Sequence, residues 1–425
     1  MNAGFGKILD LFGNGDGESL DHYYPVRPEC KDDVPPCRFR PQRGKTLSQR
    51  KWESCFSSDG RLDVARIIKR VQRGGIHPSI RGPAWEFILG CFDPNSTTKE
   101  RNQIRQERRD QYYIWKARCQ KMAPVIGSGK IVTTPLVSDD GTSASGGNNR
   151  PNSMERKKDD KSKELKWKYS LHQIGLDVLR TDRALSFYES ESNQAKLSDV
   201  LAVYSWVDSD IGYVQGMNDI CSPMVMILED EGDAFWCFYH AMRKLRENFR
   251  SSDTSLGVQS QLTTLSTIIQ TVDPELHQHL EDVAGGQYLF AIRMLMVLFR
   301  REFSFMDSLY LWELIWGMEY NPNLYSIYND SREASASDHD QKHLKQCGKF
   351  ERKIVKTGLV EEQSALAVFL LASILETKKK KLLNEASAID DVVEIMGGIT
   401  GKFDARKACK EALKIQKQYL DKTKK

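Results

Sequence analysis

The chain has 425 residues, of which 40% are hydrophobic and 28% are charged. This apolar content can bury a core, which excludes a wholly disordered chain, and no apolar run approaches the roughly 18 residues that a membrane-spanning helix needs. Lysine and arginine total 62 against 58 acidic residues, a balance that argues against a dedicated nucleic-acid-binding protein.

Residues 1–60 contain several prolines and little apolar periodicity, and they predict a largely irregular N-terminal leader. Phe5, Ile8, Leu9 and Phe12 are spaced as one face of a short helix that could contact a membrane or a partner. The neighbouring glycines favour a frayed tail instead. The first residues predict a poor secretory signal, because Asp10 interrupts the apolar stretch and no small-residue cleavage site follows.

The nine cysteines are scattered without a CxxC pair, which predicts free thiols in a reducing compartment. His277 and His279 are two positions apart and point away from each other on a helix, and no HExxH sequence occurs. We therefore expect a cytoplasmic protein with no metal site.

From residue 61 to the C-terminus the apolar pattern has the period of a helix, and the sequence predicts an all-α fold with about a dozen or more helices. No alternating strand pattern and no internal repeat is visible. In chain order, the expected helices span 62–71, 81–89, 99–122, a stretch from about 165, 197–207, 213–228, 233–249, 259–271, 288–299, 306–316, 364–375 and 405–419.

Residues 124–162 interrupt this pattern. The segment GTSASGGNNRPNS is small and polar, and the charged run ERKKDDKSKE follows it. Such a composition predicts a mobile polar insertion within a helical domain. The core of that domain is expected at about 70–383, with further helices after it.

Nucleotide-binding loops are not evident. The nearest candidate, GGITGKF at 397–403, has Met396 where the first glycine belongs and Phe403 where a hydroxyl residue would hold magnesium. The sequence therefore predicts no P-loop in this chain.

Three short segments carry more information. In Arg81-Gly82-Pro83-Ala84-Trp85 the arginine and tryptophan are four positions apart, so on a helix the guanidinium can lie against the indole. Asp177 and Arg180 are three positions apart and can form an ion pair. If neighbours hold Arg180 while it still projects, its planar fork can meet a phosphate.

In the third segment, Tyr213-Val214-Gln215-Gly216, a glutamine precedes a glycine at an expected helix start. Its amide can both donate to and accept from a water molecule. Taken singly, the three segments are explained more simply as a packing pair, a local ion pair and a helix turn with a buried polar network.

In combination and in this order, they resemble the RGxxW, IxxDxxR and YxQG segments of the TBC domain, the GTPase-activating domain for Rab GTPases. The stretch LFRREFSFMDSLYLWELIW at 298–316 extends the resemblance, which covers about 70–383. The insertion at 124–162 departs from the family pattern but lies outside both finger segments, so we expect the catalytic pair to be intact.

The resemblance implies that the chain supplies two catalytic side chains to a GTP-bound Rab. Arg180 would neutralise charge on the transferring phosphoryl group, and Gln215 would orient the attacking water. An arginine supplied in this way accelerates hydrolysis by roughly 10³–10⁵. GTP and magnesium would belong to the Rab, so the resemblance implies no cofactor of the chain's own.

The resemblance also implies residues that support the fingers: Arg81, Trp85, Asp177, Tyr213, Gly216, Asn218 and Asp219. The aspartate before the arginine finger would hold that finger or Arg81, and Trp85 would pack this cluster. Gly216 would let the backbone approach the partner, and the two polar residues after Met217 would cap or tether the loop.

Two alternatives to an active Rab GTPase-activating protein stay open at this stage. A catalytically weak scaffold of the same fold would bind Rab without useful catalysis, although intact finger residues argue against it. A nucleic-acid or membrane-surface protein could use the lysine-rich runs, but a charge balance near zero argues against that. Peripheral contact with endomembranes through the N-terminal segment is a further expectation.

Overall fold

The computed structural model describes Leu20 and residues 22–136, 154–250, 257–286, 288–329, 341–357, 365–400 and 404–423. Over these residues the regular secondary structure is helical, and extended pairing is limited to three isolated bridges. The predicted all-α class is confirmed. The amphipathic pattern at residues 5–12 lies outside the described residues.

The chain forms α1 (Gln49–Glu53), α2 (Val64–Gly74), α3 (Arg81–Ile88), α4 (Thr98–Met122), α5 (Met154–Arg180), α6 (Glu191–Val207), α7 (Met217–Ile227), α8 (Glu231–Leu245), α9 (Gly257–Val272), α10 (Pro274–Ala284), α11 (Ile292–Met296), α12 (Phe305–Met318), α13 (Leu324–Asn329), α14 (Gln341–Gln346), α15 (Lys349–Thr357), α16 (Leu366–Glu385), α17 (Ile389–Gly397) and α18 (Ala405–Thr423). Single 3-10 turns are η1 (Pro28–Cys30), η2 (Pro78–Ile80), η3 (Ser186–Glu189), η4 (Arg246–Phe249) and η5 (Leu289–Ala291).

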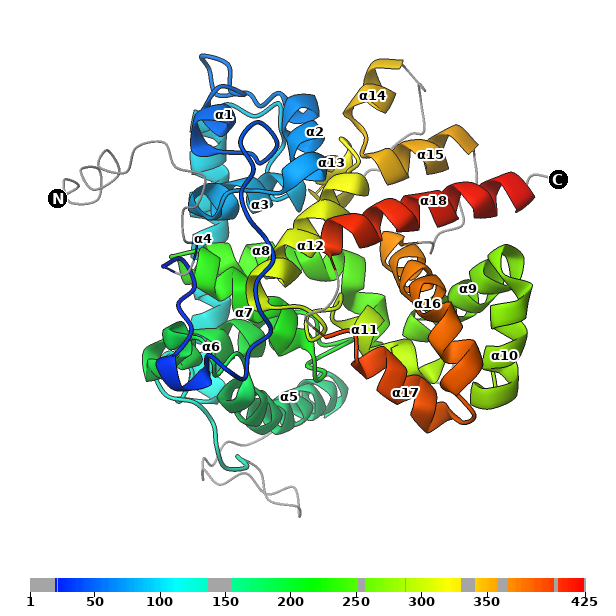
Figure 1. Cartoon of the computed structure of the whole chain (residues 1–425). Coiled ribbons are helices and arrows are strands. Elements are labelled where there is room, and N and C mark those ends of the chain that lie inside the picture. Colours follow the sequence, from blue (N-terminus) through cyan, green and yellow to red (C-terminus); the bar gives the residue numbers. More distant parts are fainter. Residues whose placement is uncertain are drawn as a thin grey trace.

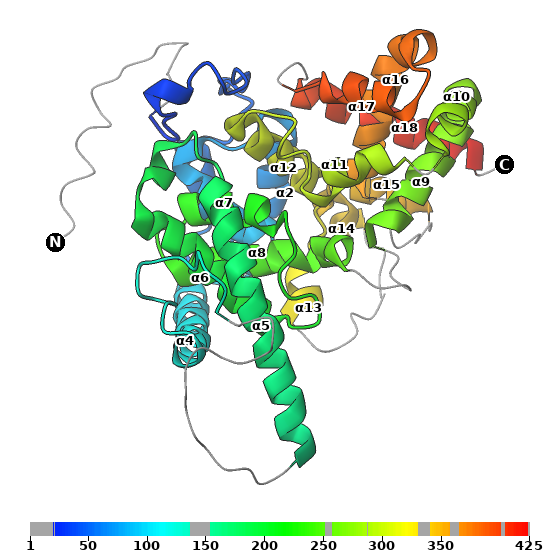
Figure 2. The same ribbon diagram turned by 90° about the horizontal axis from the view of Figure 1, so that it is seen from below.

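The helices form two groups on either side of α12. Figure 1 shows α1–α8 on one side and α9, α10, α16 and α17 on the other, and Figure 2 shows the same division from below. Every residue from Met306 to Met318 is buried, as expected for a helix that is apolar almost all round. This helix contacts α2, α15, α16 and α18, so it is the common core of both groups.

The described part of the predicted leader holds only η1 and the short α1 as regular structure, and it packs on the helical domain. The backbone N–H groups of Arg38 and Phe39 donate to the Asp307 carboxylate at 2.8 and 2.6 Å. Leu47 is fully buried and forms a bridge with Ile76. Figure 1 shows this dark blue segment crossing the face of the molecule.

The polar insertion is shorter than 124–162, because α5 already begins at Met154. The charged first half of α5 is rich in lysine and also contains glutamate, and both residue types favour a helix. Before the insertion, Val132 is buried and its carbonyl lies against α5. A Cβ at Gly175 would lie 1.7 Å from that oxygen, so this close approach requires glycine. Residues 137–153 lie outside the described residues.

The helix expected over 288–299 is broken. It forms only η5 and α11, and then turns through Leu298 and Phe299, whose φ angles are +47° and +59°. Left-handed backbone is costly for such side chains, and burial of Phe299 together with a 2.8 Å bond from Trp312 Nε1 to the Leu298 carbonyl offsets this cost.

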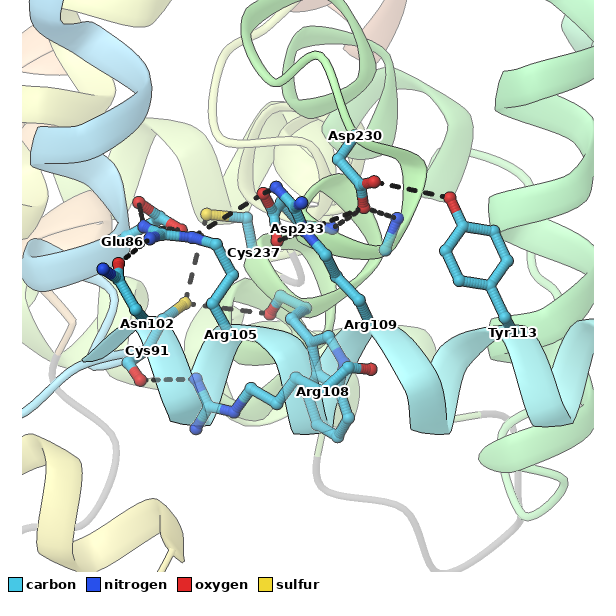
Figure 3. A network of polar contacts seen from close by, with 12 residues as sticks. Glu86, Cys91, Asn102, Arg105, Arg108, Arg109, Tyr113, Asp230, Asp233 and Cys237 are labelled. Carbon is cyan, nitrogen blue, oxygen red and sulfur yellow. Dashed lines mark hydrogen bonds and ion pairs between the residues drawn. The ribbon is translucent and has the colours of Figure 1, made fainter. Parts of the chain in front are cut away.

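A row of arginines on α4 attaches this helix to α3 and α8 (Figure 3). Arg105 Nη2 donates to both carboxylate oxygens of Glu86, at 3.1 and 2.8 Å. One turn further on, Arg109 forms a two-pronged pair with Asp233 at the start of α8. Burial raises the pKa of the Glu86 carboxyl to about 7, although Arg105 opposes the shift. The row fixes the N-terminal end of α8.

A second pair lies in the core between α3 and α12. Arg81 and Glu313 have side chains with no exposed surface, and Arg81 Nε donates to Glu313 Oε1 at 2.5 Å. The same carboxylate accepts from Trp85 Nε1 at 3.3 Å and from the backbone N–H of Ile76 at 2.8 Å. All of these donors satisfy one buried carboxylate, which is the condition for burying such a charge.

We predict that Arg81→Ala lowers the free energy of unfolding by about 3–5 kcal/mol, because it leaves Glu313 buried without its counter-charge. Chemical denaturation measures the loss. Arg61→Ala is the control, since the Arg61–Asp59 pair is on the surface, with side chains 56% and 47% exposed, and should cost no more than about 1 kcal/mol. Equal losses in both variants would contradict the prediction.

Candidate functional site

The site is built around Asp177, which lies on the last turn of α5 and has no exposed surface. Its Oδ1 accepts hydrogen bonds from Arg180 Nη2 and, at 3.2 Å, from Gln173 Nε2. Its Oδ2 accepts the hydroxyl proton of Tyr213 at 2.6 Å. One buried carboxylate therefore joins the end of α5 to the loop that precedes α7.

Asn218, buried on the first turn of α7, closes this arrangement into a ring. Its Oδ1 accepts from the backbone N–H of Gly216 at 3.0 Å and lies 3.2 Å from the Tyr213 hydroxyl. Its Nδ2 donates to Thr181 Oγ1 at 2.9 Å, and that hydroxyl donates to the Asp177 carbonyl at 2.7 Å. The chain turns after α5 and before α7 are thus held together by side-chain hydrogen bonds. We call Asp177, Thr181, Tyr213, Gly216 and Asn218 the Asp177 ring.

Arg180 is the last residue of α5, where the helix dipole favours a cation. Its side chain is 55% exposed, although the Asp177 carboxylate that it contacts is fully buried. The guanidinium is therefore anchored at one edge and open to solvent at the other. This is the arrangement required for an arginine that must meet a phosphate group outside its own chain.

Gln215 is exposed at the turn just before α7, and its side chain makes no hydrogen bond within the described part of the chain. The next residue, Gly216, is buried and has a φ of +107°. A Cβ at Gly216 would lie 3.0 Å from Val297 Cγ1. Both the positive φ and the close approach require glycine here, and the resulting turn leaves the glutamine amide in solvent.

Two arginines from the turn after α11 pack beside the Asp177 ring. Arg301 donates to Asp219 Oδ2 from Nε and Nη2, at 3.1 and 2.8 Å. Burial raises the pKa of the Asp219 carboxyl, against the effect of Arg301. Arg300 forms an ion pair with Asp182, which also accepts from Ser222 Oγ at 2.6 Å. The Arg-Arg-Glu sequence in the stretch at 298–316 is the sequence signal for these arginines, which are not among the predicted site residues.

The structure brings only part of the expected supporting set together. Tyr213, Gly216 and Asn218 join Asp177, as the expectation for a tethered loop requires. Asp219 does not join the ring and pairs with Arg301 instead.

Arg81 and Trp85 lie in the core and not in this cluster. Arg81 pairs with Glu313, so Asp177 holds Arg180 and not Arg81. The Trp85 ring packs on Trp316 with centroids 5.0 Å apart. The expectation that Trp85 packs the finger cluster is wrong, because its indole is used inside the α3–α12 contact.

No helix in the described part of the chain is long and apolar enough to cross a bilayer. The described residues also contain no cluster of three or more histidine, cysteine or carboxylate side chains arranged to hold a metal ion.

A family model described as the Rab-GTPase-TBC domain matches residues 135–328. Rab GTPase-activating protein 22 of Arabidopsis thaliana is 25% identical, over 88% of this chain and 80% of its own length. TBC1 domain family member 17 of Homo sapiens is 32% identical over 67% of this chain, but the match spans only 39% of that longer protein.

The crystal structure of the Ypt/Rab-GAP domain of Gyp1p is similar in fold, with a TM-score of 0.58 at 17% identity, over 87% of this chain and 98% of that one. The fold and the matching family model define a helical domain of the TBC type. The chain belongs to the TBC-domain family of Rab GTPase-activating proteins, and the resemblance seen in the sequence is confirmed.

We predict that Tyr213→Phe lowers the free energy of unfolding by about 1–3 kcal/mol, because it removes a donor from a buried carboxylate. Tyr169→Phe is the matched control, since Tyr169 lies on α5 and is 45% exposed; it should change stability by no more than about 0.5 kcal/mol. Urea unfolding compares the two. If both variants were equally mild, the bond from Tyr213 to Asp177 would not contribute to stability.

Proposed function

We propose that this chain accelerates GTP hydrolysis by a Rab-family GTPase and that it supplies Arg180 and Gln215 to the Rab active site. The observation that carries this proposal is the Asp177 ring, which links the turns bearing the two side chains and leaves both side chains exposed. Membership of the TBC family supports the reaction class.

Arg180 has the chemistry that phosphoryl transfer needs. Negative charge spreads over the phosphoryl oxygens in the transition state, and a planar guanidinium can donate to two of them at once. Asp177 contacts the guanidinium through Nη2, so the side chain is oriented before the partner arrives. A charge that is positioned in advance stabilises the transition state without a cost of reorganisation during the reaction.

Gln215 would act on the attacking water. Its carbonyl oxygen can accept a hydrogen bond from the water, while its NH₂ group donates to another oxygen in the site. In Ras-like enzymes the GTPase's own glutamine has this task. We infer that the turn at Gly216 presents Gln215 in its place.

The nucleotide and its magnesium would arrive with the Rab, and the chain would need no cofactor of its own. The remaining expectations are part of the same proposal: a GAP domain over residues 61–425, action in the cytoplasm, and peripheral membrane contact through the N-terminal segment, with its apolar residues at 5–12.

A single-turnover GTP hydrolysis screen against a panel of Rabs, with binding measured in parallel, tests the proposal. Stimulation of at least one Rab supports it. Binding to GTP-loaded Rab without stimulation would instead indicate the weakly catalytic scaffold, and neither binding nor stimulation across the panel would overturn both.

We predict that Arg180→Lys loses stimulation as fully as Arg180→Ala, by about 10³-fold or more, because lysine keeps the charge but lacks the fork. Rab binding should persist, since a stable interface buries far more surface than one side chain. Arg183→Lys, at an exposed position on the next turn, is the control and should keep its activity. Substantial activity in Arg180→Lys would favour simple charge neutralisation.

We predict that Gln215→Ala collapses stimulation of a wild-type Rab to the residual rate that Arg180 alone supports, while its melting temperature and Rab affinity stay near those of the wild type. Conversely, a Rab whose active-site glutamine is changed to leucine should still respond to the wild-type chain, because the water would be oriented from this side. Gln103→Ala, at an exposed position on α4, controls for loss of a surface amide.

The opposite pattern would remove Gln215 from the catalytic pair. In that case Gln215→Ala would lower thermal stability and Rab affinity together, and the glutamine-to-leucine Rab would not be stimulated at all.

A further inference from the structure

The loop that carries Gln215 has its base at Asp208, the residue that follows α6. Arg246, the first residue of η4, grips this base with a two-pronged contact: Nε to Oδ2 at 3.0 Å and Nη2 to Oδ1 at 2.8 Å. Such a paired contact fixes the orientation of both groups and not only their separation. The side chains are 28% and 15% exposed, so solvent screens the contact only in part.

Asp208, held by Arg246, is in turn bonded to the backbone of the loop. The backbone carbonyl of Asp208 accepts hydrogen bonds from the N–H groups of Ile211 and Gly212, at 3.2 and 2.8 Å. The side-chain Oδ2 of Asp208 also accepts the hydroxyl proton of Tyr204, at 3.0 Å. Although burial opposes ionisation, the bonds from Arg246 and Tyr204 keep the pKa of the Asp208 carboxyl below its usual value. The carboxylate therefore stays charged, and the first turn of the loop is rigid.

The other end of the loop contacts η4, the same four-residue turn that carries Arg246. Phe249, the last residue of η4, is buried, and a Cβ at Gly216 would lie 3.4 Å from its ring. η4 thus contacts the loop at Asp208 and at Gly216, the residue directly after the glutamine. Between these points Tyr213 bonds to Asp177. The loop is held at three places, and Gln215 is the exposed residue beside the last of them.

We propose that Arg246 is a positioning residue for Gln215, acting through the base of the loop and not through contact with the nucleotide. The proposal rests on the proposed function, since it assigns Arg246 a role only if Gln215 orients the water. The ion pairs of Asp210 with Arg246 and Arg250 do not carry this role, because Asp210 is 62% exposed and such surface pairs contribute little.

The frame that holds Arg246 is α8, which immediately precedes η4. The arginine row on α4 fixes the opposite, N-terminal end of α8 at Asp233 (Figure 3). At about 1.5 Å per residue, the two ends of this helix are about 20 Å apart. Arg105 is a control at that remote end: its side chain is also 28% exposed, its Nη2 donates to both carboxylate oxygens of Glu86 on α3, and its Nε lies 3.8 Å from Asp233 Oδ2 at the start of α8.

The test is single-turnover hydrolysis by a responsive Rab as a function of GAP concentration. Arg246→Ala should lower the maximal rate by about tenfold, as expected for a small misplacement of a catalytic group, with half-saturation within about twofold of the wild type. Arg246→Lys should be intermediate, because it keeps the charge without the fork. Asp208→Asn, which keeps the shape of the partner, should resemble Arg246→Lys. Arg105→Ala should keep the maximal rate even if its melting temperature falls.

A double-mutant cycle separates positioning from general damage. In the Gln215→Ala background, Arg246→Ala should cause no further loss of rate. Independent, multiplicative losses would overturn the proposal, as would a maximal rate for Arg246→Ala equal to that of the wild type. If the wild-type chain stimulates no Rab, the proposed function itself fails and the role of Arg246 with it; if the wild type is active and the cycle is additive, only the role of Arg246 fails.

Discussion

A carboxylate buried at the end of α5 must be surrounded by donors, because an unpaired charge away from water is strongly unfavourable. Asp177 obtains its donors from its own helix and from the loop before α7: Arg180 on one oxygen and Tyr213 on the other. Satisfying this single charge therefore sets the distance between two segments that the chain separates by a helix and two connections. The candidate site exists because both segments must meet at Asp177.

Two arginines that each pair with a buried carboxylate differ in their own burial, and this difference decides whether they contribute to stability or are available to a partner. Arg81 has no exposed surface, and its N–H groups are used within the core, by Glu313, the Tyr24 hydroxyl and the Ile76 carbonyl, so it joins α3 to α12. Arg180 also contacts a fully buried carboxylate, but more than half of its own side chain is exposed. Only the second arrangement leaves N–H donors for another molecule, which is why the proposed catalytic role falls to Arg180.

The rigidity of the candidate site comes from layers further out. The Asp177 ring holds the middle of the glutamine loop, η4 holds its two ends, and the α4 row fixes the helix that leads into η4. The turn after α11 adds Arg301 against Asp219. Most of these contacts join charged or polar groups of different elements, and Phe249 adds an apolar contact at Gly216, so the exposed glutamine is supported from several sides.

The sequence by itself determined the helical class, because a period of 3.6 residues in apolar positions is a local property. It also identified Arg180, Gln215 and Gly216 as candidates, because they lie in short segments that can be recognised from residue spacing alone. It did not reveal that Glu313, 232 positions away, is the partner of Arg81, nor that Arg246 holds the loop of Gln215. The early start of α5 and the break at Leu298 were also missed. Partners that are distant in the chain, and left-handed residues that burial stabilises, leave no periodic signal, so only the tertiary structure decided them.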